Sequence, residues 1–201
     1  MEEEQGFDGP VAWDTPGTRS ALHRWTAWNL AKSLGWVALW WAALYVTVVL
    51  LPVAAVVPMV LVLCAITFVA SGALGRLAQG VRIRRVLTVY PWRQLPGAVR
   101  ADKGSAVFVL PDPDHPDKTV SLRSKAWLLR SWTAEALKDY DEELWYAGDP
   151  RFACVLAKPV PRGLFCLTQP TAYDWRTSPR RKGLSPEARR RARAIGARVA
   201  D

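Results

Sequence analysis

Three groups of residues carry side chains that could do chemistry: an acidic loop, a pair of cysteines and two isolated histidines. The acidic loop, PDPDHPDK, contains Asp112, Asp114, His115 and Asp117. Carboxylate oxygens together with one imidazole can bind a divalent cation. However, the loop lacks the glycine and the distal glutamate of an EF-hand, and its three prolines are typical of a rigid, solvated turn. We therefore predict no metal site and no cofactor.

The second group is the pair Cys154 and Cys166. If the segments around them form a hairpin in which Ala157 pairs with Gly163, the two cysteines lie directly opposite each other. A shift of one residue in that register would separate them. Neither cysteine has a CxxC spacing or a basic neighbour, so we expect reduced, buried, small hydrophobic residues. A redox role is the alternative.

The histidines offer little support for catalysis. His23 precedes a long apolar run and His115 belongs to the acidic loop, and the chain has neither a GxSxG elbow nor a Walker loop. We therefore predict that the protein is not an enzyme. The alternative is an enzyme that acts on a lipid or membrane substrate, with Asp112, His115 or Cys154 in its site.

The elements that position these residues begin with an uncharged run. No charged residue occurs between Lys32 and Arg76, and this length is about twice the roughly 20 residues that one bilayer crossing requires. Pro52 and Pro58 mark a break, because proline lacks a backbone donor and restricts the residue before it. The run therefore predicts a transmembrane hairpin at 33–76, with helices at 33–51 and 56–76.

The flanking charges predict the orientation of this hairpin. Arginine and lysine precede the first helix and arginine follows the second, whereas the connecting turn has no cation. Because such cations stay cytoplasmic, we expect both termini in the cytoplasm. The preference for arginine over lysine, with abundant alanine, valine and proline, suggests a bacterial chain. The predicted location is thus the bacterial inner (cytoplasmic) membrane, as a multi-pass protein.

Aromatic residues crowd the start of the first predicted helix. Tryptophan is favoured at the headgroup level of a bilayer, so we predict interfacial anchors at Trp25, Trp28, Trp36, Trp40 and Trp41. The segment 19–32 also has an amphipathic spacing, and we expect it to lie in the interface before the chain turns inward. Small residues at four-residue spacing, Ala38 with Ala42 and Ser71 with Gly75, allow either packing within the hairpin or a contact between two copies.

The second half of the chain has the composition of a soluble domain. Alternating apolar runs predict strands at 95–101, 105–111, 119–124, 143–147, 151–157 and 163–168, and an apolar period of three to four residues predicts a helix at 124–140. Because neighbouring strands should pair, residues 96–175 are expected to form a small cytosolic α+β domain, with an antiparallel sheet and one covering helix.

Basic residues dominate two further segments. A juxtamembrane linker at 77–95 follows the hairpin, and we predict lipid headgroup contacts at Arg76, Arg82, Arg84 and Arg85. The tail at 176–201 has nine bases against two acids, and Ser185, Pro186 and Glu187 predict the start of a short helix in it. The predicted partner-binding residues of this tail are Arg180, Arg181, Lys182, Arg189, Arg190, Arg191 and Arg193.

Such a tail could bind anionic lipid, nucleic acid or an acidic protein surface. We favour membrane lipid, or a membrane-protein partner or second copy, because no nucleic-acid reading module accompanies the tail. Residues 1–18 are acidic and expected to be disordered. The sequence therefore predicts a two-pass, non-enzymatic accessory or scaffold subunit that presents an interaction domain and a basic tail. A membrane-tethered nucleic-acid-binding protein is the alternative.

Overall fold

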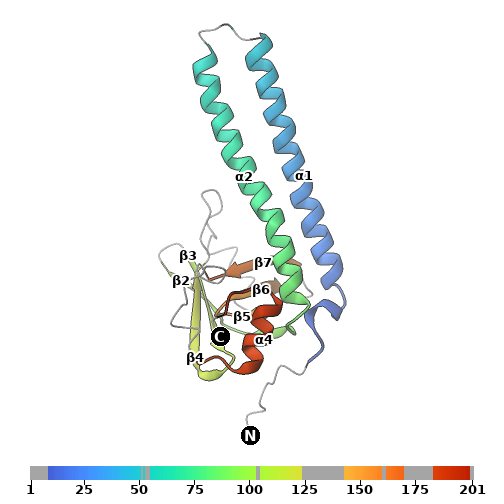
Figure 1. Ribbon diagram of the computed structural model, residues 1–201, viewed down its shortest axis with the longest axis vertical. Coiled ribbons are helices and arrows are strands. Elements are labelled where there is room, and N and C mark those ends of the chain that lie inside the picture. Colours follow the sequence, from blue (N-terminus) through green and yellow to red (C-terminus); the bar gives the residue numbers. More distant parts are fainter. Residues whose placement is uncertain are drawn as a thin grey trace. The chain divides into compact units, whose positions relative to one another are not determined.

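The computed structural model describes residues 9–50, 52, 55–102, 105–123, 143–159, 162–169 and 183–199. Figure 1 shows long helices and antiparallel strands within these ranges. The chain divides into two compact units, Leu22–Val81 and Met1–Ala21 with Arg82–Asp201. We call them the helical unit and the sheet unit. Residues 1–8 of the N-terminus predicted to be disordered, 1–18, and the predicted helix at 124–140 lie outside the described residues. The prediction does not hold for the rest of that N-terminus, because Ala12–Asp14 form a 3₁₀-helix and Ala12 is fully buried.

Two long helices confirm the predicted helical pair, but both are longer than predicted. Helix α1 spans Thr18–Tyr45 and continues as a π-helix, η2 (Val46–Leu50), and helix α2 spans Val56–Leu87. The prediction of a separate interfacial helix at 19–32 is therefore wrong, because α1 runs through residues 32 and 33 without a break. Ser33 lies within this unbroken helix, and its hydroxyl donates to the carbonyl oxygen of Asn29, one turn earlier, at 2.8 Å.

The predicted linker at 77–95 also needs correction, since α2 continues to Leu87. Ile83, Val86 and Leu87 recur at helical spacing and are fully buried. Burial of this apolar stripe stabilises the last turns of α2 as helix, although arginines lie between its members. The basic residues after the apolar run are therefore part of a regular element.

Packing within the helical unit uses a few specific contacts. Trp40 donates from its indole nitrogen to the hydroxyl of Thr67 at 3.1 Å. Gly80 leaves room for Trp25, since a Cβ at that glycine would lie 3.1 Å from the indole ring. The small residues buried here include Ala73, whereas a Cβ added at Gly75 would meet nothing within 4 Å. The predicted role of Gly75 in packing within the hairpin is therefore not observed.

The strands of the sheet unit form two antiparallel sheets. One sheet has the order β1-β5-β6-β7 and the other the order β2-β3-β4. Their bounds are β1 (Arg93–Leu95), β2 (Val99–Asp102), β3 (Ser105–Asp112), β4 (His115–Arg123), β5 (Leu144–Asp149), β6 (Ala153–Lys158) and β7 (Arg162–Thr168). The six predicted strands are confirmed. Sequence reasoning missed the short β1 and placed all strands in one sheet.

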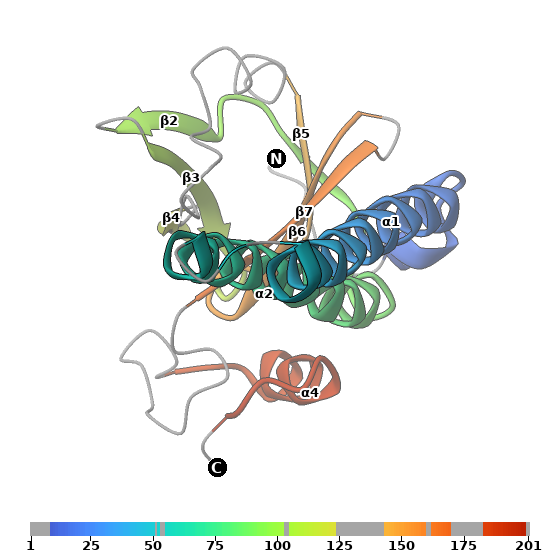
Figure 2. The same ribbon diagram turned by 90° about the horizontal axis from the view of Figure 1, so that it is seen from above.

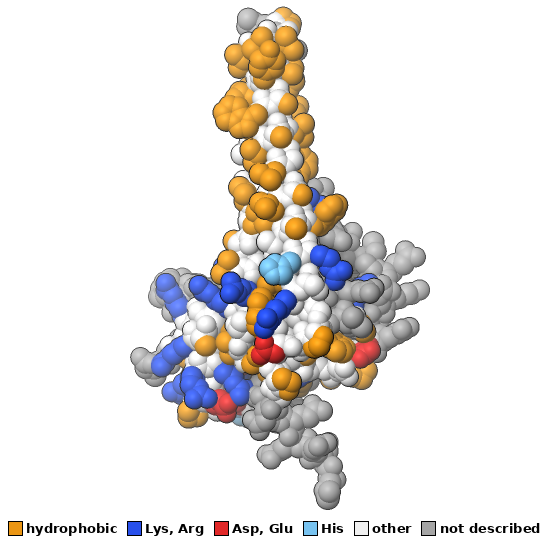
Figure 3. Space-filling model, turned by 90° about the vertical axis from the view of Figure 1, so that its right-hand side faces the viewer, with side chains coloured by type: hydrophobic (Ala, Val, Ile, Leu, Met, Phe, Trp, Pro, Cys, Tyr) orange, Lys and Arg blue, Asp and Glu red, His pale blue; other side chains and the backbone are white. Residues whose placement is uncertain are grey.

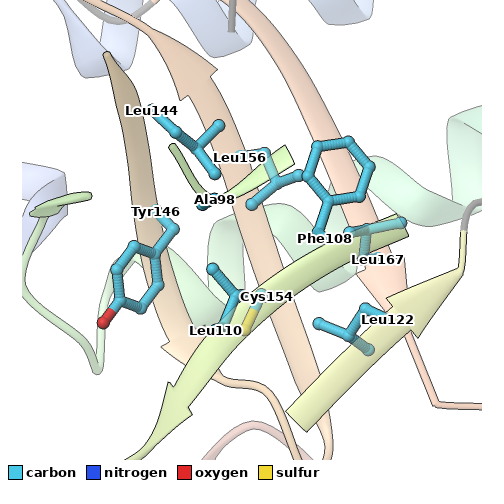
Figure 4. Packing of buried hydrophobic residues seen from close by; sticks show 9 residues of the cluster. All are labelled: Ala98, Phe108, Leu110, Leu122, Leu144, Tyr146, Cys154, Leu156 and Leu167. Atoms are coloured by element: carbon cyan, nitrogen blue, oxygen red, sulfur yellow. The ribbon is translucent and has the colours of Figure 1, made fainter. Parts of the chain in front are cut away.

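The core of the sheet unit lies between the two sheets. Figure 4 shows apolar side chains of both sheets in contact, including Phe108, Leu110 and Leu156. Strand β6 is buried along almost its whole length, on both faces. The sheet β1-β5-β6-β7 also approaches the end of α2, since Val86 lies 3.1 Å from a Cβ built on Gly148. Figure 2 shows the two sheets and the short helix α4 (Pro186–Ala194).

The start of the described chain is fastened to the segment that follows α2. The 3₁₀-helix η1 (Ala12–Asp14) begins where the amide of Ala12 donates to the carbonyl oxygen of Tyr90 at 2.9 Å. Trp92 donates from its indole nitrogen to the hydroxyl of Thr18, the first residue of α1, at 3.1 Å. The start of α1 and the end of α2 are therefore both built into the sheet unit.

The backbone of Gly148 allows a test of this packing. Its φ is +124°, and a Cβ there would overlap the carbonyl oxygen of Ala153 and lie 2.9 Å from Cα of Cys154. We expect Gly148→Ala to lower the free energy of unfolding by about 3 kcal/mol or more, measured by denaturant unfolding in detergent. Gly97→Ala is the control, because Gly97 has a φ of +65° but open space around it, and it should cost about 1 kcal/mol. Equal effects would contradict the packing described.

Candidate functional site

The predicted basic tail contains a helix that is docked on the sheet unit. One face of α4 is apolar and buried, with Ala188, Ala192 and Ile195 below 10% exposure. Leu184 before the helix and Ala197 after it are also buried. The described end of the tail is therefore a folded part of the sheet unit.

Both ends of α4 have regular caps. The hydroxyl of Ser185 accepts from the amide of Ala188 at 3.2 Å, and Pro186 occupies the first turn. The predicted start of this helix is thus confirmed. At the other end, Gly196 has a φ of +80°, its amide donates to Arg193, and the amide of Ala197 donates to Ala192. This is a Schellman motif, and it closes the helix at the glycine.

A buried guanidinium connects α4 to the strands. The Arg151 side chain is only 2% exposed. Its Nε and Nη2 atoms donate to the two carboxylate oxygens of Asp149 at 2.9 and 2.7 Å, and Nη1 donates to Oδ2 of Asp114 at 2.7 Å. Nη1 also lies 3.1 Å from Oδ1 of Asp112. One side chain from the β5–β6 turn therefore binds three carboxylates, two of them at the β3–β4 turn.

Asp114 also binds Ser185, the residue that caps α4. Its carboxylate accepts from the amide of Ser185 at 3.1 Å and from the hydroxyl of the same residue at 2.9 Å. Burial alone would raise the pKa of Asp114, but the hydrogen bonds from Arg151 and Ser185 outweigh it and hold the pKa below its ordinary value. Burial would likewise lower the pKa of Arg151, and the carboxylates of Asp149 and Asp114 raise it instead. Arg151 therefore stays charged.

This cluster explains the acidic loop. Asp112 and Asp114 face Arg151, and His115 Nδ1 lies 4.0 Å from Asp112 with its side chain 44% exposed. The described residues contain no group of three or more histidine, cysteine or acidic side chains arranged to hold a metal ion. The two carboxylates thus serve as structural ion-pair partners.

Both cysteines are buried and unpaired, as predicted. Of the two registers left open, the structure has the one that separates them: Cys154 lies opposite Leu167 and Cys166 opposite Val155, one residue away from the symmetric pairing. An irregularity between Leu156 and Lys158 produces this shift. Burial raises the pKa of Cys154 well above its usual range and that of Cys166 to about 12. Both thiols stay protonated at neutral pH and are poor nucleophiles.

The predicted tryptophan anchors occupy different levels of one helix. Trp25 and Trp41 are sixteen residues apart in α1, which corresponds to a rise of about 24 Å. A helix normal to a bilayer would therefore place them at different depths, and their role as anchors stays a prediction. Trp28 and Trp41 are more than 60% exposed, and Trp28 lies 4.7 Å beneath the ammonium of Lys32. Trp40 is half-buried, as are Trp25 and Trp36.

The predicted lipid-contact arginines divide between the two units. Arg76 belongs to the helical unit, and Arg82, Arg84 and Arg85 belong to the sheet unit. All four are exposed. Arg84 lies 5.6 Å from the ring centroid of Trp13, while a Cβ at Gly196 would lie 3.0 Å from Nη1 of Arg85. Arg85 therefore lies beside the C-terminal end of α4.

The exposed face of α4 is the strongest candidate for a binding surface. Arg189, Arg190 and Arg193 are exposed and, with Pro186, line a shallow, open depression. Their spacing along the helix places them on one side, and we call them the arginine face. Arg191, which was predicted with them, is half-buried and donates to Glu187. Arg180, Arg181 and Lys182 lie outside the described residues.

Sequence reasoning missed Arg151 and the contact between Asp114 and Ser185. The turn GDPRF carried a partial signal, because an aspartate two residues before an arginine in a tight turn can form a local ion pair. Nothing in the sequence indicates that Asp114, 37 positions earlier, reaches the same guanidinium. Gly196 was a usable signal for the end of α4.

No known family model matches this chain, and no curated protein or solved structure is significantly similar to it.

Replacement of Arg151 tests the role of the cluster. Arg151→Ala leaves Asp149 buried without its counter-charge, and we expect the free energy of unfolding to fall by about 3 to 5 kcal/mol. Denaturant unfolding of the full chain in detergent, followed by near-UV circular dichroism, measures the change. Arg189→Ala is the control, because it removes an exposed arginine and should change stability by less than about 0.5 kcal/mol. A small effect of Arg151→Ala would mean that the cluster is dispensable.

The pKa of Asp114 predicts a dependence of stability on pH. Because the folded-state pKa lies below the ordinary value of 3.8, the stabilisation is present above that value. It is lost as the pH falls through the folded-state pKa. We expect Asp114→Asn to destabilise the protein at about pH 6 and to lose less stability than wild type between about pH 5 and pH 2. Asp117→Asn, on the same hairpin, is the control. Parallel pH profiles for wild type and Asp114→Asn would contradict this role.

Proposed function

We propose that the protein is a two-pass membrane protein of the bacterial inner membrane, with both termini in the cytoplasm. It acts as a non-enzymatic accessory or scaffold subunit that presents its sheet unit and arginine face to a membrane complex or to anionic lipid. The observation that carries this proposal is the outward-facing apolar surface of α1 and α2.

The two helices are long and apolar enough to cross a bilayer, and only 11% of the most apolar window of each is buried within the protein. Figure 3 shows hydrophobic side chains over the surface of the helical unit. Val48, Val57 and Leu61 are each about 70% exposed or more. Soluble proteins rarely expose continuous apolar surface of this extent, and a bilayer would cover it.

Polar groups in the apolar part of this unit are consistent with a lipid environment. The hydroxyls of Thr47, Thr67 and Ser71 each donate to a carbonyl oxygen four residues earlier. Such bonds satisfy the side chains within their own helix, which hydrocarbon requires. The cations Arg24 and Lys32 on α1 and Arg76 on α2 lie outside the uncharged run, and this arrangement favours a cytoplasmic location for both ends.

The side chains that could have supported catalysis support a structural role instead. Arg151 binds the carboxylates of Asp112 and Asp114, and Cys154 and Cys166 are buried. The feature of the described sheet unit that could bind another molecule is the positive charge of the arginine face. A nucleic-acid ligand is a second candidate, because the same three guanidinium groups would attract a phosphate backbone.

A pull-down from carbonate-washed membranes tests the proposal. We expect the chain to resist alkaline carbonate and, after extraction in mild detergent, to retain a defined membrane protein despite nuclease treatment and salt up to about 0.3 M. The same experiment with Arg189→Gln/Arg190→Gln/Arg193→Gln shows whether the arginine face contributes. Release by carbonate would disprove the membrane location. Recovery of nucleic acid alone, lost after nuclease treatment, would replace the accessory role with the nucleic-acid alternative.

A further inference from the structure

We propose that the arginine face of α4 docks on the phosphate groups of anionic phospholipids. The inference rests on the proposed membrane location and names the surface that the sheet unit uses there. Its components are Arg189, Arg190 and Arg193, together with Arg85 beside the C-terminal end of α4.

The described residues supply little negative charge to Arg189 and Arg190. Within the described residues, neither Arg189 nor Arg190 has an ion pair, and both are exposed. The nearest acid on the helix, Glu187, is bonded to Arg191. Arg189 and Arg190 therefore keep a positive charge that an anionic ligand can neutralise.

The chemistry of the face favours phosphate. A guanidinium presents parallel N–H groups that pair with two oxygens of one phosphate, and arginine is more weakly hydrated than lysine. No large apolar side chain is exposed on α4, whose exposed residues are Pro186, Glu187, Arg189, Arg190, Arg193 and Ala194. The face would therefore adsorb on headgroups by electrostatics and without insertion of an apolar wedge.

The face is also held in a fixed shape. Ser185 is bonded to Asp114 at one end of α4, and the Schellman motif closes the other. The apolar side of the helix is buried. Because the backbone is already ordered, binding would cost only side-chain freedom.

The position of Arg85 favours lipid over a soluble polyanion as the ligand of the arginine face. This residue extends the basic surface to α2, the helix that would cross the bilayer. A surface tethered to a membrane meets its headgroups at a high effective concentration, whereas a soluble partner gains nothing from the tether.

Capture of nanodiscs by vesicles tests this inference with the full chain. The protein is placed in neutral phosphatidylcholine nanodiscs, which are then floated with vesicles that contain either phosphatidylcholine alone or 30% phosphatidylglycerol. We expect capture by the anionic vesicles only, and a loss of about 100-fold for Arg189→Gln/Arg190→Gln/Arg193→Gln. Capture should weaken steeply with salt. It should also fall when the nanodiscs themselves contain phosphatidylglycerol, because the face is then already occupied.

Matched variants separate charge from geometry. Arg190→Gln and Lys118→Gln each remove one exposed cation, and only the former should weaken capture. The triple lysine variant of the arginine face should bind more strongly than the triple glutamine variant, because it keeps the charge, and more weakly than wild type, because lysine lacks the paired N–H groups of guanidinium. Equal capture of wild type and the triple glutamine variant would overturn the inference, as would binding to a DNA duplex in preference to the vesicles. Failure of the chain to enter nanodiscs would instead disprove the proposed function.

Discussion

The sheet unit depends on the charge of one buried side chain. Arg151 lies where the β5–β6 turn, the β3–β4 turn and the start of α4 meet. It binds one carboxylate of the β5–β6 turn and two of the β3–β4 turn. Removing a guanidinium from water is costly, and it is tolerated here because five of its polar contacts are to carboxylate oxygens within 3.2 Å. The same contacts fix the position of Asp114, which in turn holds Ser185 and the first turn of α4.

The ion pairs of Arg151 give the carboxylates of the acidic loop a structural role. The acidic loop resembles a possible ligand set in isolation, but its carboxylates are required by Arg151. The two cysteines pack in opposite faces of the strands, since Cys154 belongs to the cluster between the sheets and the adjacent register position of Val155 places Cys166 on the other face. The exposed surfaces remain for function. They are apolar on the helical unit and basic on α4, and these two properties match the interior and the headgroups of a membrane.

Local patterns in the sequence predicted much of the fold. The uncharged run between Lys32 and Arg76 predicted two helices, alternation predicted six strands, and Ser185 with Pro186 predicted the start of α4. The failures concern contacts between distant positions. Strand β1 has three residues and pairs with a strand 50 positions away, and the cysteine register depends on an irregularity that periodicity does not reveal. The full length of α2 depends on burial of Ile83, Val86 and Leu87, which only the tertiary structure supplies.

The two sides of α4 have separate tasks. Alanine and isoleucine on the inner side, with capping groups at both ends, hold the helix in place. On the outer side, Arg189 and Arg190 are exposed and form no ion pair with the described residues. A lineage of such proteins could therefore change the outer residues one at a time, without losing the fold at any step, and so acquire a different partner by gradual evolution.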